Sequence, residues 1–173
     1  MTAEELFKQL QGRLAQTMRE LPPIIGEEVV HFAQDNFDRQ AYNGEAWKKR
    51  KNPTKWGKRD EEGRALLVKT AKLRRSIRVS RVEKDRVTVV AGGADVPYAK
   101  VHNEGFSGVV EQKVNPFLRR GKKGEPIAVK GHTRTIYQNI PKRQFIGDEE
   151  SSAELRQRIK NIVNIELQKI FKQ

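Results

Sequence analysis

The spacing of apolar residues changes twice along this chain, and these changes constrain the fold more than any other feature of the sequence. Near the start, four apolar residues recur four positions apart: Leu6, Leu10, Leu14 and Met18. This spacing places them on one face of a helix. A second helical stripe runs over residues 155–170, whereas the segment between the two stripes alternates in the manner of strands. Helices are therefore predicted to flank a strand-rich middle.

The first stripe is interrupted by Pro22 and Pro23. Proline disfavours helical geometry in the residue before it, yet it suits the first turn of a new helix. A further apolar stripe begins at Ile25 and reaches Phe37. The pattern predicts two helices that meet at a corner.

Capping boxes are predicted at the starts of the first and last helices. Thr2 with Glu5, and Ser151 with Glu154, have the required spacing of three residues.

Strand patterns occupy the middle of the chain. Residues 76–83 and 86–92 alternate apolar and polar side chains around a Glu-Lys-Asp turn, which predicts an antiparallel hairpin. Further strands are predicted at residues 98–102, 109–114 and 133–138. Residues 65–77 could form a short helix or lead into a strand. The predicted fold class is α+β, with an antiparallel sheet packed against N- and C-terminal helices in a single domain of residues 1–173.

Two segments, at about residues 44–64 and 113–134, lack any apolar period. Both are rich in Gly or Pro and in Lys and Arg. Such segments cannot recover the entropy of ordering from core contacts. We expect them to be exposed, irregular basic loops that are mobile in the free protein.

The charge of the chain restricts the classes of partner that it can have. Lys and Arg number 35 against 22 acidic residues, which gives a net charge of +13. Nucleic acid, an acidic protein surface and anionic lipid all remain candidate partners. The absence of cysteine excludes disulfides and thiolate metal sites. No run approaches the ~18 apolar residues of a membrane span, so we expect a soluble protein made in the cytoplasm.

One basic segment also contains both tryptophans. Six of its residues are candidate contacts to a partner or to DNA: Trp47, Lys48, Lys49, Arg50, Lys51 and Trp56. Such cations could neutralise phosphates while the indoles stack on bases. Alternatively, the cations and the indoles could both contact an acidic protein partner through charge pairing and cation–π interactions. The alternative is a solvated loop.

No group of residues in the sequence indicates a catalytic site. His31, His102 and His132 are scattered and lie outside any metal-binding spacing, and His31 is expected to be a partly buried helix residue. Asp95 and Glu104 flank one segment without a visible partner. No phosphate-binding loop is present in the sequence. We therefore predict no enzyme, no catalytic or metal-binding residues and no cofactor.

Three segments together resemble one family. The stretch LVKTAKLRRSIRV at 67–79, the stretch VPYAKVHNEG at 96–105 and the stretch IPKRQFIG at 140–147 are similar in order and spacing to motifs of phage virion morphogenesis and tail-completion proteins. Ala71 stands where that family has a Gly, so a left-handed turn is less expected there. Each segment also has a structural interpretation, in which Phe145 anchors in the core and Gly147 releases the chain into the last helix.

The resemblance implies a structural protein for tail completion or head-tail (neck) assembly. The partners would be other phage tail or neck proteins, with a homo-oligomeric ring in the virion and nonspecific DNA contact as further expectations, and no membrane. The location would be the virion, and the host cytoplasm during assembly. The alternative is a stand-alone, sequence-nonspecific nucleic-acid-binding protein. A nuclease that uses His102 is a third hypothesis.

Overall fold

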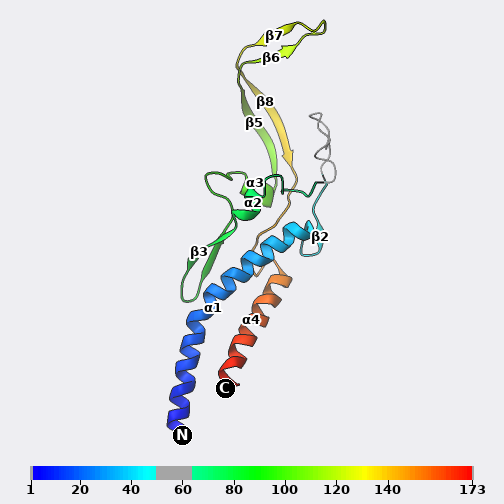
Figure 1. Cartoon of the computed structure of the whole chain (residues 1–173). Helices are drawn as coiled ribbons and strands as arrows, with labels where there is room; N and C mark the ends of the chain where they lie inside the picture. The colour runs from blue at the N-terminus through cyan, green and yellow to red at the C-terminus, as the bar shows by residue number, and fades with distance from the viewer. Residues whose placement is uncertain (1, 50–63, 173) are drawn as a thin grey trace.

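The structure is a computed structural model that describes residues 2–49 and 64–172. Two long helices form its base, α1 (Ala3–Arg39) and α4 (Ala153–Phe171), which lie side by side and run in opposite directions (Figure 1). Small antiparallel sheets and two short helices lie above them. The α+β class is confirmed. Among the described residues, however, the strands form four separate two-stranded sheets instead of one larger sheet.

Helix α1 is continuous through both prolines, so the prediction of two separate helices was wrong. Proline removes local hydrogen bonds and bends a helix, but Leu21, Pro22 and Gly26 are buried against neighbouring elements, and this packing keeps the helix intact. Figure 1 shows that the axis of α1 bends partway along its length.

The caps agree with the sequence at the first helix and differ by one residue at the last. The Thr2 hydroxyl accepts a hydrogen bond from the Glu5 N–H and the Glu5 carboxylate accepts one from the Thr2 N–H, which confirms the capping box. At α4 the cap is Ser152, whose side chain accepts from the Leu155 N–H.

The predicted hairpin is present as β3 (Arg78–Val82) and β4 (Val87–Val90). It packs across α1 at Gly26. A Cβ atom at this position would lie 2.9 Å from both the Val79 Cγ2 and the Val87 Cγ1 atoms. The absence of a side chain at residue 26 therefore lets the hairpin approach the helix.

A long ribbon extends away from the helices (Figure 1). It consists of β5 (Phe106–Val114) and β8 (His132–Ile140), paired over nine residues each, and it continues into β6 (Phe117–Arg120) and β7 (Pro126–Val129). The strands predicted at 109–114 and 133–138 are confirmed. Residues 113–134 are exposed, as expected, but they are not irregular, because cross-strand pairing orders them without a core. We call residues 106–140 the arm.

Two short helices flank the hairpin along the chain, one before β3 and one between β4 and the arm. Helix α2 (Lys72–Arg75) decides the choice between helix and strand that residues 65–77 left open. Ala71 precedes α2 with φ 53°, so the left-handed turn forms even without the family's glycine.

The strand predicted at residues 98–102 was wrong, because these residues enter α3 (Ala99–Glu104). Ala99 and Asn103 are four residues apart, and helical geometry lets both face inward. Two more strands, β1 (Ala41–Tyr42) and β2 (Glu45–Ala46), form a small hairpin directly after α1.

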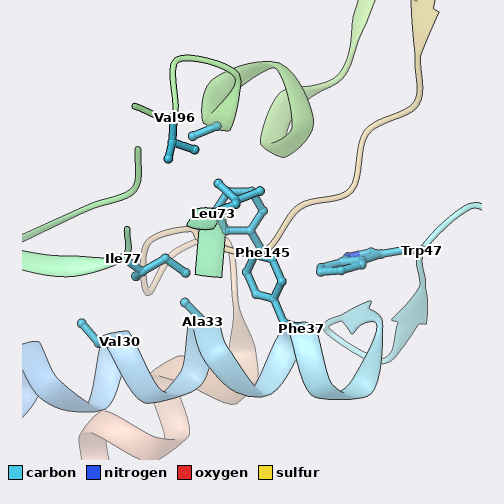
Figure 2. Close-up of a cluster of buried hydrophobic side chains, with 9 residues drawn as sticks. Val30, Ala33, Phe37, Trp47, Leu73, Ile77, Val96 and Phe145 are labelled. Carbon is cyan, nitrogen blue, oxygen red and sulfur yellow. The ribbon is translucent and has the colours of Figure 1, made fainter. Parts of the chain in front are cut away.

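The core lies where the short helices meet α1 (Figure 2). Phe145 and Leu73 are almost fully buried, and Phe145 packs on Phe37 with their ring centroids 5.0 Å apart. The expectation that Phe145 anchors in the core is confirmed. This cluster fixes the base of the arm to the C-terminal part of α1.

Candidate assembly interfaces

The family-like segments meet at one junction at the base of the arm. Asn103 Oδ1 accepts hydrogen bonds from the backbone N–H groups of Phe145 and Ile146, at 3.0 and 3.1 Å. The Arg143 N–H donates to the His102 carbonyl at 2.8 Å, and the Asn36 side chain donates to the Phe145 carbonyl at 3.2 Å. These contacts tie α1, α3 and the segment after the arm together. The junction is therefore a structural joint.

Trp47 belongs to the same junction. Its side chain is only 6% exposed, its ring packs edge-on against Phe37, and its Nε1 donates to the Gln144 carbonyl at 2.7 Å. An indole held in this way is not available to stack on a base. The expectation that Trp47 contacts a partner directly is therefore corrected to a structural role.

The other candidate contacts divide between the described and undescribed parts of the chain. Lys48 and Lys49 are exposed, and the Lys48 carbonyl accepts a hydrogen bond from Arg143 Nε at 2.9 Å. Arg50, Lys51 and Trp56 lie outside the described residues. The structure thus anchors the start of this basic segment at Trp47 and presents its first two lysines to solvent.

An apolar groove of about 890 Å³ lies between α1, the β3–β4 hairpin and α4. Its lining includes Met18 and Ile25 from α1, Val87 from β4, and Ile159 and Val163 from α4. Charged residues of the hairpin turn, of α3 and of the segment before α4 also line it: Lys84, Asp85, Arg86, Lys100, Glu104, Asp148 and Glu149. An apolar surface with a polar rim is the usual composition of a protein-protein interface.

The N-terminal part of α1 continues this apolar surface. Leu6, Phe7, Leu14 and Met18 are exposed, with Phe7 at 63%. In Figure 1 this part of the helix projects beyond the hairpin. An amphipathic helix with an uncovered stripe gains free energy when a partner covers it.

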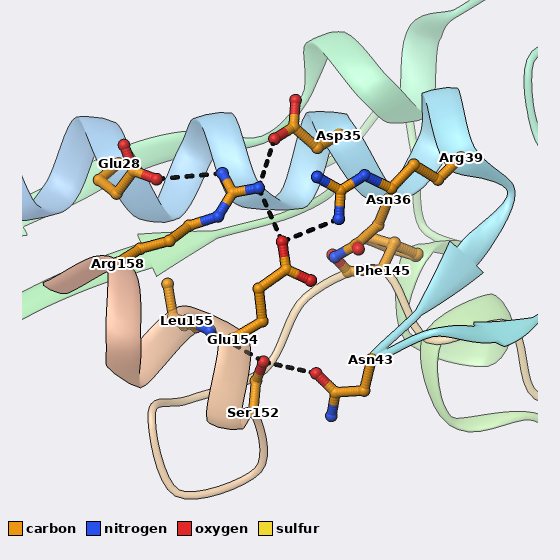
Figure 3. A network of polar contacts seen from close by, with 10 residues as sticks. All are labelled: Glu28, Asp35, Asn36, Arg39, Asn43, Phe145, Ser152, Glu154, Leu155 and Arg158. Atoms are coloured by element: carbon orange, nitrogen blue, oxygen red, sulfur yellow. Dashed lines mark hydrogen bonds and ion pairs between the residues drawn. The ribbon is translucent and has the colours of Figure 1, made fainter.

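An ion-pair network holds the two long helices together (Figure 3). Arg158 of α4 contacts Glu28 at 3.1 Å, Asp35 at 2.8 Å and Glu154 at 2.8 Å, and Glu154 also pairs with Arg39 at 2.8 Å. Burial opposes the charge on Arg158, but the hydrogen bonds that its guanidinium donates to the three carboxylates raise its pKa above the usual value. Burial also disfavours the charge on Glu154, while Arg39 and Arg158 give that carboxyl a lowered pKa overall. The network therefore sets the relative position of α1 and α4, which form two walls of the groove.

The three histidines lie on different elements, His31 on α1, His102 on α3 and His132 on β8. His31 is exposed, contrary to the expectation of partial burial, because it points away from the stripe that packs inward. His132 is also exposed, and its Nδ1 lies 3.0 Å from the Lys130 carbonyl. No group of three acidic or imidazole side chains suited to a metal ion occurs in residues 2–49 and 64–172.

His102 is the one histidine in a partly buried setting. Its ring packs edge-on against Tyr98, and its Nδ1 has no hydrogen-bond partner within the described chain. Burial, and secondarily the charge of Arg143, lower the pKa of His102 from the ordinary 6.5. Asp95 and Glu104 are both exposed. The histidine is held by packing at the base of the arm.

Comparison with known proteins identifies the family. A family model described as the phage virion morphogenesis family matches residues 2–168. The chain belongs to the phage virion morphogenesis family. The match spans α1, the core, the arm and all but the last three residues of α4. No match was found among curated proteins or among solved structures.

Membership in this family makes the protein a phage morphogenesis protein, consistent with a structural role and with contacts to other phage proteins. None of the described helices is long and apolar enough to cross a membrane.

The sequence motifs that indicated the family lie at the structural junction at the base of the arm. The groove was not predicted, because its walls come from α1, the hairpin and α4, which are distant from one another in the sequence. Two of those walls had a signal in the sequence. The alternation of apolar residues at 86–92 indicated the hairpin wall, and the helical stripe at 155–170 indicated the α4 wall.

Proposed function

We propose that this protein completes the phage tail or the head-tail junction (neck) as a structural component, by contacts with other virion proteins and without catalysis. The observation that carries the proposal is the apolar groove between α1, the hairpin and α4, together with the exposed stripe of α1. A partner element with an apolar side, such as an amphipathic helix or strand of another tail or neck protein, would cover this surface.

The charge on the rim of the groove would orient such a partner. On the hairpin the two cations Lys84 and Arg86 outnumber Asp85, whereas the charged lining residues before α4 are the acidic Asp148 and Glu149. Opposite charges on different walls favour one direction of docking over its reverse. Assembly of this kind would take place in the host cytoplasm and leave the protein in the virion. A homo-oligomeric ring in the particle would present several grooves at once.

Lys48, Lys49, Arg50, Lys51 and Trp56 remain proposed contacts to a partner or to DNA. The position of Trp47 supports this role indirectly, because its buried ring fixes the point at which the basic segment leaves the core. Exposed lysines at a fixed exit can meet an acidic surface that docks beside the junction.

A deletion-and-complementation experiment tests the assembly role. A phage that carries this gene would lose the gene and receive wild-type protein, a Met18→Asp variant or an Ile165→Asp variant from a plasmid. Met18 lines the groove and Ile165 does not, yet both are exposed, so neither change should disturb folding. Circular dichroism of the purified variants checks this.

We expect the deletion to yield unjoined or abnormal heads and tails by electron microscopy, with almost no infectious particles. The wild type and Ile165→Asp should restore infectivity, and Met18→Asp should restore much less, because a carboxylate cannot be buried cheaply in an apolar contact. Complete, infectious particles in the absence of the protein would refute the proposal.

A further inference from the structure

The arm concentrates positive charge. Between residues 106 and 140 it carries seven Lys and Arg against two acidic residues, and all seven are exposed: Lys113, Arg119, Arg120, Lys122, Lys123, Lys130 and Arg134. Four of them fall within the five positions 119–123, which span the end of β6 and the turn that follows. The tip of the arm is therefore the most densely cationic part of the ribbon.

These cations lack acidic partners within the described residues, unlike several arginines of the body. None of the seven forms an ion pair with any residue in 2–49 or 64–172, and Arg134 hydrogen-bonds only to the neutral Gln112 side chain. By contrast, Arg74 makes a two-pronged contact with Asp38, and Arg158 contacts three carboxylates. Unpaired like charges on a narrow ribbon repel one another, and a polyanion relieves that repulsion by displacing its own counterions.

The strand register places cations on both faces of the ribbon. Arg119 and Arg120 are neighbours on β6 and so point to opposite faces, and the same holds for Lys113 on β5 and Arg134, which lies opposite Gln112. A flat protein surface would meet only one of these faces. In a DNA groove, phosphates line both walls, so cations on both faces can be neutralised together.

The arm also holds its charge away from the acidic part of the molecule. Helix α1 contains seven Asp and Glu against four Lys and Arg. The arm leaves the body at the end opposite to the N-terminus of α1 (Figure 1), and nine paired residues in β5 span roughly 30 Å at the rise of a strand. The tip can therefore approach a polyanion without bringing α1 close to it.

From these observations we propose that the arm binds the sugar-phosphate backbone of double-stranded DNA independently of sequence. The tip cations Arg119, Arg120, Lys122 and Lys123 neutralise phosphates while the two-stranded ribbon lies in a groove. The major groove of B-DNA is about 12 Å wide and admits such a ribbon. This activity goes beyond the assembly role, because it requires no partner protein and uses a different surface from the apolar groove.

The test measures the binding of the full-length protein to two unrelated 20-base-pair duplexes by fluorescence anisotropy at several salt concentrations between 50 and 200 mM. The arm variant combines Arg119→Gln, Arg120→Gln, Lys122→Gln and Lys123→Gln. The matched control combines Lys8→Gln, Arg19→Gln, Lys160→Gln and Lys172→Gln, which removes the same charge from exposed positions on α1, on α4 and at the C-terminal cap of α4. Circular dichroism confirms that both variants fold.

We expect equal affinity for the two duplexes, an affinity loss of at least about tenfold in the arm variant, and a salt slope shallower by about 3 units, since each phosphate contact contributes about 0.9. The control should keep the wild-type slope within about one unit. A double variant, Phe117→Ser with Leu118→Ser, should bind DNA like the wild type.

Three results would each overturn the proposal. Equal losses in the arm variant and the control would assign binding to net charge alone. No binding of the wild-type protein at 50 mM salt would point to an acidic protein as the partner of the arm. A loss in the Phe117→Ser, Leu118→Ser variant as large as that of the arm variant would assign the interaction to apolar contact.

Discussion

At the residue scale, Asn103 determines how the arm joins the body. Its Oδ1 is the acceptor for two consecutive backbone N–H groups, those of Phe145 and Ile146, at a partly buried position. A buried donor without a partner costs about 1–3 kcal/mol. One side-chain oxygen therefore prevents two such losses and also fixes the segment on which Phe145 enters the core.

We predict that Asn103→Leu lowers the free energy of unfolding by about 2–4 kcal/mol, because both N–H groups lose their acceptor. Asn103→Asp keeps an oxygen at the same position and should cost much less. Urea denaturation of the two variants measures both values. Similar losses in the two would mean that side-chain shape, and not the acceptor, matters at this position.

His102 makes the stability of the protein depend on pH. Burial and Arg143 lower its pKa in the folded state, so the unfolded chain binds more protons at mildly acidic pH. Its contribution to the free energy of unfolding is therefore fully present above 6.5, the ordinary pKa, and is lost as the pH falls toward the folded-state pKa.

We predict that His102→Phe, which keeps a ring against Tyr98, reduces the drop in unfolding free energy between pH 7.5 and pH 5.5. His132→Phe, at an exposed position, serves as the control and should leave that drop unchanged. Thermal unfolding at the two pH values gives the comparison. An unchanged drop in His102→Phe would exclude this histidine as its source.

The sequence indicated which residues form the junction, but it did not indicate the role of each. The family-like motifs located Asn103 and Phe145, and the core position of Phe145 was predicted. Trp47 was predicted as a surface contact because its neighbours in the sequence are lysines. Its burial depends on Phe37 and Gln144, which are distant in the sequence, so local composition could not indicate it.

At the element scale, the contact between α1 and the hairpin depends on Gly26. A Cβ atom there would press on branched side chains of β3 and β4, which have little freedom to move away. Gly12 lies on the same helix, and an added Cβ atom would meet nothing within 4 Å. Substitution of Gly12 by Ala therefore reports helix propensity alone, whereas the same substitution at Gly26 also reports the packing of the hairpin on α1.

We predict that Gly12→Ala raises the free energy of unfolding by up to about 1 kcal/mol, the ordinary gain of helix propensity. Gly26→Ala should lower it by about 1 kcal/mol, because overpacking of about 1–3 kcal/mol exceeds the same gain. Urea denaturation measures both changes. If both substitutions stabilise the protein equally, the hairpin does not pack on α1 as described.

Periodicity predicted most of the elements and failed where tertiary contacts decide the structure. The β3–β4 hairpin and the strands β5 and β8 follow the alternation of their residues. Helix α3 was mistaken for a strand, because six residues are too few to separate the two periods and Asn103 finds its partners only in the folded chain. The tip of the arm has no apolar period in its sequence, so β6 and β7 were not predicted. Cross-strand pairing orders these two strands.

At the scale of the whole molecule, charge is segregated. Helix α1 is acidic, whereas the arm and the segment around Lys48 are basic, so the net charge of +13 is unevenly spread. The apolar groove lies at the helical base, and the cationic arm leaves from the other end (Figure 1). Net charge predicted a polyanionic or acidic partner, but only the fold shows that the apolar and basic surfaces are separate.

The central claim is that the protein acts by becoming part of the particle. Purified protein would be titrated into a lysate of the deletion phage, and infectious particles counted at each concentration. A structural component is consumed, so the number of particles should rise linearly and reach a plateau at a fixed number of chains per particle, with the protein retained in purified particles. Full recovery at far fewer than one chain per particle, with no protein retained, would contradict the account and indicate catalysis.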